Sequence, residues 1–383
     1  MNDARTSFIS LPRFHLWNKL KQKRALVSFD IEITSRCNNN CRHCYINLPE
    51  NDPVAKGKEL ALAHLKEIVD EAVTLGALWC LITGGEPLLR DDFIDIYLYL
   101  KKKGLLVSIF TNATLITKTH VKLFKQYPPR NLEVSVYGVT QETYERVTRK
   151  PGSFTAFLHG LHLLLDSRVS VRLKAMAIRS NFFELQEIAG FCREKTVGDF
   201  RFDPFLHLRF DGDPIRNRAI KAERLTPKEI TCLESSDPQR LAALKKECDN
   251  LIVPSFLHTS SNTIFQCSAG MCSFNLSFDG LFRLCSSLWN RDCVYDLKAG
   301  TLTEAWYDFA PRVRKMRSQK DAFLTHCRIC PFINLCMWCP AHAHLESGQL
   351  DQPVDYFCQV ARARAQAFGD NRGLERVEAF HSE

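Results

Sequence analysis

Strand-like and helix-like segments alternate along the first half of the chain, and this alternation restricts the fold more than any other feature. Short apolar runs are separated by longer segments with helical periodicity. The expected strands are 26–34, 78–83, 105–111, 132–137, 170–178 and 199–205, and the expected helices are 62–75, 92–103, 118–126, 154–166 and 182–195. Strands joined through helices form parallel sheets. Six such units predict an α/β fold, a partial (β/α)6 TIM-like barrel, rather than the full eight-fold barrel.

Apolar and polar side chains alternate within these strands. In the first strand Phe29 and Ile31 share one face, whereas Asp30 and Glu32 share the other. If helices cover the outside, the polar rows point into the barrel, which then holds a ligand. An antiparallel sheet with one wet face is the disfavoured alternative. Side chains of the polar rows that can orient a substrate, move a proton or pair with one another are Glu32, Glu133, Tyr137, Arg172, Lys174, Arg201 and Asp203. We assign no catalytic base.

Cysteine usage depends on the compartment. No apolar run reaches the ~18–20 residues of a membrane span, and the N-terminus lacks a signal-peptide pattern, so we expect a cytoplasmic protein. Thiols stay reduced there, and sixteen cysteines therefore predict metal or iron–sulfur ligation rather than disulfides. The net charge is +8, with basic residues enriched over 13–24. We interpret this segment as solvated rather than as a nucleic-acid face; attraction of an acidic peptide or redox partner is the weaker alternative.

Three cysteines follow the first strand directly. Cys37, Cys41 and Cys44 have the spacing Cys-x3-Cys-x2-Cys, at the carboxyl end of a strand, where α/β active sites gather. Three thiolates leave one iron of a [4Fe–4S] cluster with an open coordination position, as three protein ligands do in catalytic zinc sites. Taken alone, the triplet also fits a zinc knuckle or buried thiols.

A second motif, Thr-Gly-Gly-Glu-Pro, closes the second expected strand at residues 83–87. Its two glycines allow the backbone to approach a ligand closely, and Glu86 supplies an acceptor for an ammonium group. By itself the motif is also consistent with a plain turn at the end of a strand.

Together, the two motifs resemble the radical S-adenosylmethionine (SAM) superfamily over residues 26–205. The resemblance implies a [4Fe–4S] cluster on Cys37, Cys41 and Cys44, with SAM bound to its open iron and cleaved reductively to methionine and a 5′-deoxyadenosyl radical. It also implies cofactor contacts: the methionyl ammonium with Gly84, Gly85 and Glu86, adenine with His43, and the methionyl end with Ser135 and, as a weaker candidate, Asn112.

The C-terminal part contains eight further spaced cysteines: Cys267, Cys272, Cys285, Cys327, Cys330, Cys336, Cys339 and Cys358. Paired Cys-x2-Cys elements are typical of a zinc ribbon, which is the alternative. In context the group resembles the SPASM extension, although its final Cys-x2-Cys is one residue shorter than usual. The resemblance implies two auxiliary [4Fe–4S] clusters, one on Cys267, Cys272, Cys285 and Cys339 and the other on Cys327, Cys330, Cys336 and Cys358. Cys272 is the least secure ligand, and without it the first auxiliary cluster can bind substrate directly.

The remaining cysteines fall outside every motif, and we expect Cys80 and Cys192 to be buried small hydrophobes. The predicted organisation is an N-terminal segment (1–25), the barrel (26–208), a helical linker (209–264), the SPASM extension (265–368) and a polar tail (369–383).

The resemblance implies oxidation of a peptide or protein side chain, such as thioether or carbon–carbon crosslinking. The expected partners are that substrate, a flavodoxin or ferredoxin reductant and a separate leader-recognition protein, because the barrel begins almost at once; neither nucleic acid nor a membrane is expected. A haem-pathway enzyme acting on a tetrapyrrole is the enzymatic alternative, and a non-catalytic iron–sulfur or zinc scaffold is the alternative of another class. Sulfatase maturation is disfavoured, because Ser286 rather than an acidic residue follows Cys285.

Overall fold

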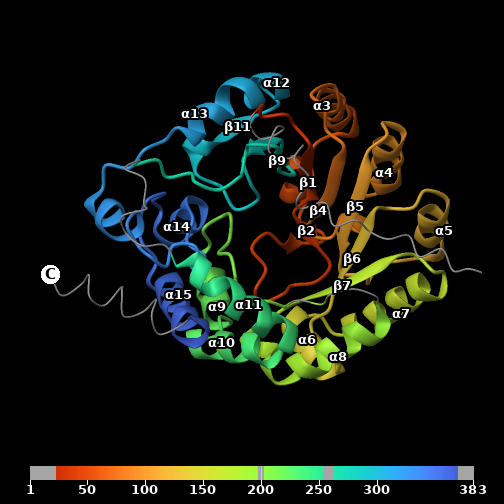
Figure 1. The fold of residues 1–383 in the computed structure, drawn as a ribbon. Helices are drawn as coiled ribbons and strands as arrows, with labels where there is room; N and C mark the ends of the chain where they lie inside the picture. Colours follow the sequence, from red (N-terminus) through yellow and green to blue (C-terminus); the bar gives the residue numbers. More distant parts are fainter. Residues whose placement is uncertain (1–22, 197–199, 201, 253–261, 370–383) are drawn as a thin grey trace, which may run out of the picture.

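Six parallel strands form the barrel part of the fold. The computed structural model describes residues 23–196, 200, 202–252 and 262–369. The strands are hydrogen-bonded in chain order: β1 (Ser28–Thr34), β4 (Trp79–Gly84), β5 (Leu106–Thr111), β6 (Asn131–Ser135), β7 (Val171–Met176) and β8 (Phe202–Asp203). Figure 1 shows the helices outside this curved sheet: α3 (Leu62–Thr74), α4 (Phe93–Lys102), α5 (Lys118–Gln126), α7 (Ser153–Asp166) and α8 (Leu185–Lys195). The predicted α/β partial barrel is confirmed.

Some elements differ from the expected ones. The helix expected from residue 182 begins instead at Leu185, after a 3-10 helix over Arg179–Glu184. There the Asn181 side chain accepts a hydrogen bond from the backbone N–H of Ile178 and donates to the carbonyl oxygen of Met176, which holds the tighter turn. The helices that were not predicted include α2 (Pro53–Lys58) and α6 (Gln141–Thr148). Both flank the loop that carries the first three cysteines.

The C-terminal part continues the same sheet. Strand β9 (Ser273–Leu276) pairs in parallel with β1, and β10 (Leu281–Arg283) and β11 (Val294–Asp296) follow as antiparallel neighbours. The attachment of these strands to the barrel was not predicted from the sequence. The sheet therefore has nine strands, with β1 between the barrel and the C-terminal part.

Stacked aromatic rings bury the junction between the two parts. The ring centroids of Phe29 on β1 and Phe274 on β9 lie 5.4 Å apart, and those of Phe274 and Phe282 lie 5.1 Å apart. Trp306 packs against the same cluster and is fully buried. The three phenylalanines lie on strands, and Phe29 comes from the apolar row of β1, as the alternation predicts, so the polar residues of β1 face the other way.

The polar rows pair with one another inside the barrel. The ammonium of Lys174 on β7 lies 3.7 Å from the carboxylate of Glu133 on β6 and over the ring of Phe110. Burial lowers the pKa of Lys174 to about 8, although Glu133 opposes this effect. This pair confirms the expectation that some of the lumen charges balance each other.

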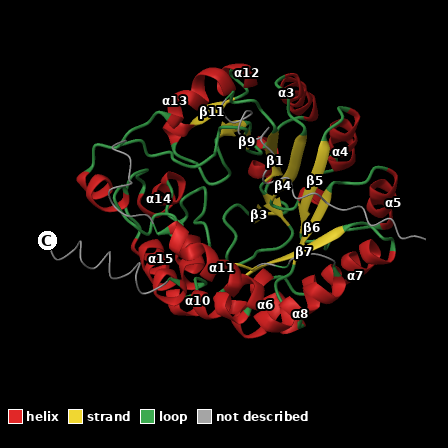
Figure 2. Ribbon diagram, viewed as in Figure 1, coloured by secondary structure: helices red, strands yellow, loops and turns green. Residues whose placement is uncertain are grey.

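Helices complete the C-terminal half. The expected helical linker contains α9 (Pro214–Ala222), α10 (Pro227–Ser236) and α11 (Pro238–Leu251), each beginning at a proline, which suits a first helical position. Figure 2 shows α10 and α11 beside α15 (Asp355–Phe368), with α14 (Pro340–Ser347) nearby. No helix in the described ranges is long and apolar enough to cross a membrane. Most of the basic stretch 13–24, Arg201 and nearly all of the polar tail lie outside the described residues.

Replacement of Phe29 by Ala tests the aromatic junction. The side chain is fully buried between β4 and β9 neighbours, so Phe29→Ala should lower the free energy of unfolding by about 3–5 kcal/mol. The matched control is Phe183→Ala, because the Phe183 side chain is 86% exposed and should contribute less than about 0.5 kcal/mol. Urea titration followed by tryptophan fluorescence measures both changes. Equal effects in the two variants would contradict the assignment of the junction as core.

Candidate active site

The first three cysteines lie on a loop that is closed at its base. Cys37 ends the short strand β2 (Arg36–Cys37), which pairs with β3 (Leu48–Pro49) after the loop. The Arg36 guanidinium donates to Glu59 at 2.7 Å and to the carbonyl oxygen of Glu50 at 2.9 Å. This buried ion pair fixes the base of the loop, so the three cysteines project from an anchored segment.

Backbone amides already point at two of the sulfurs. The N–H groups of Asn39 and Asn47 donate to the Sγ atoms of Cys37 and Cys44, each at 3.4 Å. Burial, and after it the neighbouring thiols, raises the pKa of Cys37 and of Cys41 well above the ordinary value. Two buried thiols that resist ionisation suit a cationic iron core, which supplies the missing positive charge. The donor set therefore fits a [4Fe–4S] cluster with three protein ligands.

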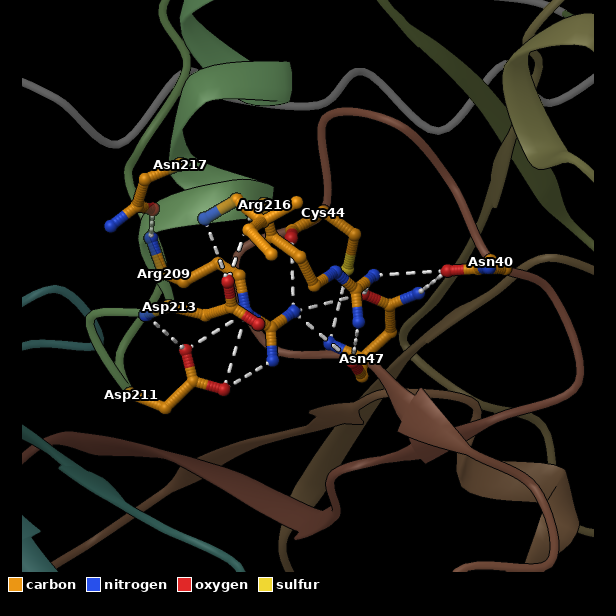
Figure 3. A network of polar contacts seen from close by, with 9 residues as sticks. Asn40, Cys44, Asn47, Arg209, Asp211, Asp213, Arg216 and Asn217 are labelled. Carbon is orange, nitrogen blue, oxygen red and sulfur yellow. Dashed lines mark hydrogen bonds and ion pairs between the residues drawn. The ribbon is translucent and has the colours of Figure 1, made fainter.

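Two arginines beyond the barrel clamp the outer side of the loop (Figure 3). Arg209 and Arg216 both donate to Asn47, through its backbone carbonyl and through its side-chain oxygen, over distances of 2.6–3.2 Å. Arg216 also donates to the side-chain oxygen of Asn40 at 3.0 Å. Arg209 is oriented by an ion pair with Asp211, in which Nη2 and Oδ2 lie 2.5 Å apart. The Arg209 side chain is only 1% exposed. Sequence reasoning missed this clamp, because nothing local to residues 209–216 indicates a partner more than 160 residues away.

The glycine–glutamate turn lies against the start of the same loop. Gly84 has a φ of +136°, and a Cβ atom on Gly85 would lie 2.1 Å from the carbonyl oxygen of Arg36. The N–H of Gly85 donates to Thr34 at 2.7 Å and that of Glu86 donates to Arg36 at 2.9 Å. The glycines thus allow a close approach of one backbone segment to another. Their predicted contact with a ligand stays a prediction.

Glu86 has structural partners for both of its oxygens. Oε1 accepts from the hydroxyl of Thr111 at 2.8 Å and from the N–H of Leu88 at 3.2 Å, and Oε2 accepts from the N–H of Asn112 at 2.7 Å. Burial raises the pKa of this carboxyl to about 7, although the three hydrogen bonds lower it. Glu86 therefore holds the end of β5 beside the cysteine loop, and its contact with an ammonium group stays a prediction.

The other predicted cofactor contacts converge on the same place. The Asn112 amide donates to Asn38 at 3.0 Å and lies 3.8 Å from the sulfur of Cys37. The centroid of the His43 ring lies 5.3 Å from that of Tyr137, with the two planes tilted by 59°. Among the described residues the buried Nδ1 of His43 has no partner, and burial lowers the pKa of His43 to about 4. Ser135 interacts with the Tyr137 hydroxyl. A neutral imidazole, a buried hydroxyl and an amide thus surround the loop.

The C-terminal cysteines gather in two groups. In one group, burial and then the charge of Cys358 raise the pKa values of Cys327 and Cys330, and a hydrogen bond with Cys358, followed by burial, raises the pKa of Cys336. In the other group, Cys285 interacts with Cys267 and Cys339. Cys272 lies close enough to Arg24 to influence the pKa of the arginine. The role of Cys272 as a cluster ligand stays a prediction. In the described part of the chain, no three Cys, His, Asp or Glu side chains converge on the position of a single metal ion.

The cysteines outside the motifs are mostly interior. Cys80 and Cys192 are each 1% exposed, as expected, and Cys248 and Cys293 are equally buried, whereas Cys232 is exposed. The Cys293 sulfur lies 3.8 Å from the sulfur of Met316. These four buried thiols pack as small hydrophobes.

Comparison with known proteins agrees with this geometry. Residues 31–191 match the Radical SAM superfamily. The Fe-coproporphyrin III synthase of Methanosarcina barkeri is 24% identical, over 84% of each chain. The subtilosin biosynthesis protein AlbA of Bacillus subtilis is 30% identical, over 45% of this chain and 38% of that protein.

A solved structure extends the likeness to the whole fold. The structure of Streptococcus suis SuiB bound to its precursor peptide SuiA covers 89% of this chain and 78% of its own, with a TM-score of 0.66 and 16% identity. That likeness includes the cysteine-rich C-terminal part. The matched barrel, the three-cysteine loop and the glycine–glutamate turn lead to one conclusion: residues 31–191 of this chain form a radical SAM domain, and the protein is an enzyme.

Proposed function

We propose that the protein is a three-cluster radical SAM oxidoreductase that abstracts hydrogen from a peptide or protein side chain. The observation that carries the proposal is the gathering of the C-terminal cysteines into two groups within the fold that also presents the cysteine loop. Net oxidation of a substrate leaves an electron after hydrogen abstraction, and two auxiliary clusters provide acceptors of tunable potential.

The residues divide into three roles in this proposal. Cys37, Cys41 and Cys44 hold the cluster at whose open iron SAM is cleaved to the 5′-deoxyadenosyl radical. The buried ring of His43 offers adenine a neutral surface, and Ser135 and Asn112 offer polar contacts to the methionyl end. The auxiliary ligands are Cys267, Cys272, Cys285 and Cys339 for one cluster and Cys327, Cys330, Cys336 and Cys358 for the other.

A peptide substrate has support from the relatives' names. AlbA is named for bacteriocin biosynthesis, and SuiB was solved with a precursor peptide. We propose thioether or carbon–carbon crosslinking as the outcome, in a reducing cytoplasm, with flavodoxin or ferredoxin as the electron donor. A separate protein that recognises a leader sequence completes the proposed set of partners.

A tetrapyrrole substrate is the second candidate. The Fe-coproporphyrin III synthase match spans 84% of both chains, whereas the AlbA match spans less than half of either. A porphyrin would present its propionate carboxylates to the lumen, whereas a peptide would present amides.

Reductive cleavage of SAM is the first experiment. After anaerobic reconstitution and reduction with dithionite, the protein should form 5′-deoxyadenosine, quantified by chromatography. Absence of this product with all clusters loaded would leave only the non-catalytic scaffold. Short peptides encoded by neighbouring reading frames and a set of tetrapyrroles are then added, and a mass change identifies the class of substrate. Zinc in place of iron in the C-terminal part would contradict the auxiliary clusters.

Removal of the first three thiols should abolish cleavage without emptying the C-terminal sites. The triple variant Cys37→Ala, Cys41→Ala and Cys44→Ala should fall from about twelve to about eight irons per chain and form no 5′-deoxyadenosine. The control is Cys232→Ala, whose exposed side chain lies outside both cysteine groups and which should retain about twelve irons. Iron and sulfide analysis measures both variants. Loss of all iron from the triple variant would contradict the proposal that the C-terminal clusters bind independently of the first cluster.

A single methyl group should disturb the loop. In Gly85→Ala the new Cβ would meet backbone atoms of Ser35 and Arg36 at 2.1–2.8 Å, so the start of the cysteine loop must shift. We expect the 5′-deoxyadenosine rate to fall at least tenfold, because even a shift of about 1 Å at an active site is costly. Gly57→Ala is the matched control, since a Cβ there meets nothing within 4 Å. Equal rates in the two variants would show that the close contact is unimportant.

A further inference from the structure

A buried polar network lies on the lumen faces of β1, β9 and β10. Arg283 on β10 donates from Nη2 to the Glu32 carboxylate on β1 at 2.5 Å and also to the side-chain oxygen of Asn275 on β9. The Arg283 guanidinium stacks 3.6 Å from the ring centroid of Trp289. Glu32 and Arg283 are fully buried, and Asn275 is 1% exposed. The network thus crosses the junction between the barrel and the C-terminal part.

The network lies between two groups of cysteines. Tyr45, the residue after Cys44, is buried close enough to Glu32 and Arg283 for both to influence its pKa. On the other side, Arg283 donates to the carbonyl oxygen of Ser286 at 2.7 Å, next to Cys285. A substrate that loses hydrogen near the loop and an electron toward the C-terminal part must lie between the cysteine loop and Cys285.

Four atoms of the network have unused hydrogen-bonding capacity. Among the described residues no partner exists for Glu32 Oε1, Asn275 Nδ2, Arg283 Nε or Trp289 Nε1, although all four atoms are buried. Native proteins rarely leave a buried polar group without a partner, because its desolvation is then uncompensated, so four in one network point to an occupant. Trp289, which is half-buried beside Phe210, forms the more accessible edge of the network.

The unused atoms specify the chemistry of that occupant. Three of them are donors and one, on Glu32, is an acceptor. The charge of Arg283 is already balanced by Glu32, so a carboxylate would gain no free cation and would meet the Glu32 oxygen. A secondary amide matches instead, because its carbonyl oxygen accepts from the donors while its N–H donates to Glu32.

We infer that Glu32, Asn275, Arg283 and Trp289 form a subsite that binds a peptide group of the substrate. The inference rests on the proposed peptide-modifying function and narrows it. The subsite selects a neutral amide over a carboxylate, so it places a backbone segment, rather than an acidic group, beside the cysteine loop.

Ligand-observed saturation-transfer NMR on the reconstituted holoenzyme tests the subsite with three matched probes. They are N-acetylglycine N-methylamide, N-acetylglycinamide and N-acetylglycine, which share one skeleton and end in a secondary amide, a primary amide and a carboxylate. The methylamide should bind at least fivefold more tightly than the acid. Preference for the primary amide over the methylamide would assign the subsite to an Asn or Gln side chain and would overturn the backbone assignment.

Two variants locate the binding. Trp289→Phe keeps the ring over Arg283 but removes the N–H, and it should weaken methylamide binding about fivefold. Glu32→Gln leaves the Arg283 charge unbalanced, so it should reverse the preference and favour the acid. The control is Trp306→Phe, which removes a hydrogen bond already made to the carbonyl oxygen of Arg24. That variant should lower the melting temperature by about 2–4 °C without changing probe affinity.

The outcomes separate this inference from the proposed function. The subsite would be overturned if the acid bound as tightly as the methylamide or more tightly, or if Trp289→Phe left the affinity unchanged. It would also be overturned if no probe bound, because water alone would then satisfy the network. Formation of 5′-deoxyadenosine is measured in the same preparations. If cleavage persists without amide preference, only the subsite fails; if amide preference persists without cleavage, the proposed function fails.

Discussion

The contact between the glycine turn and the backbone of residues 34–36 is the constraint on which the rest of the site depends. Thr34 ends strand β1. The N–H groups of Gly85 and Glu86 in the turn donate to the carbonyl oxygens of Thr34 and Arg36. Side chains on either glycine would push the segments apart. Because Cys37 follows Arg36 immediately, this contact sets the direction in which the cysteine loop leaves the sheet. Glu86 then fixes the end of β5 to the same turn, because its carboxylate accepts a hydrogen bond from the N–H of Asn112.

Strand β1 transmits that alignment to the C-terminal part. It hydrogen-bonds to β4 on one side and to β9 on the other, so residues about 240 positions apart share one register. Its apolar face packs Phe29 on Phe274, and its polar face brings Glu32 to Arg283. One strand thus serves as core on one face and as the proposed substrate surface on the other. A radical enzyme needs this rigidity, because its reactive group must meet one hydrogen atom and exclude others.

How much the sequence could predict depended on the range of the interactions involved. Strands such as β5 and helices such as α5 followed from local periodicity, and the burial of Cys80 followed from its apolar strand. The glycine turn was visible as a motif, but its backbone partner was not. The clamp of Arg209 on Asn47 had no local signal at all, because it joins segments 162 residues apart through side chains that serve equally well on a solvated surface. The attachment of β9 was missed for the same reason.

The distribution of charge explains why the cysteine sites and the fold depend on each other. Burial resists ionisation of the thiols. At Cys339 burial is the largest single effect, but the hydrogen bonds and the charge of His342 together outweigh it and lower the pKa. His342 in turn meets the ring of His207 edge to face, with the centroids 4.5 Å apart, and the His207 ring is hydrogen-bonded to the hydroxyl of Ser287 near Cys285. Elements from both halves of the chain therefore support one thiol. Metal binding requires these thiols to be ionised together, so its free energy also ties the two halves to each other.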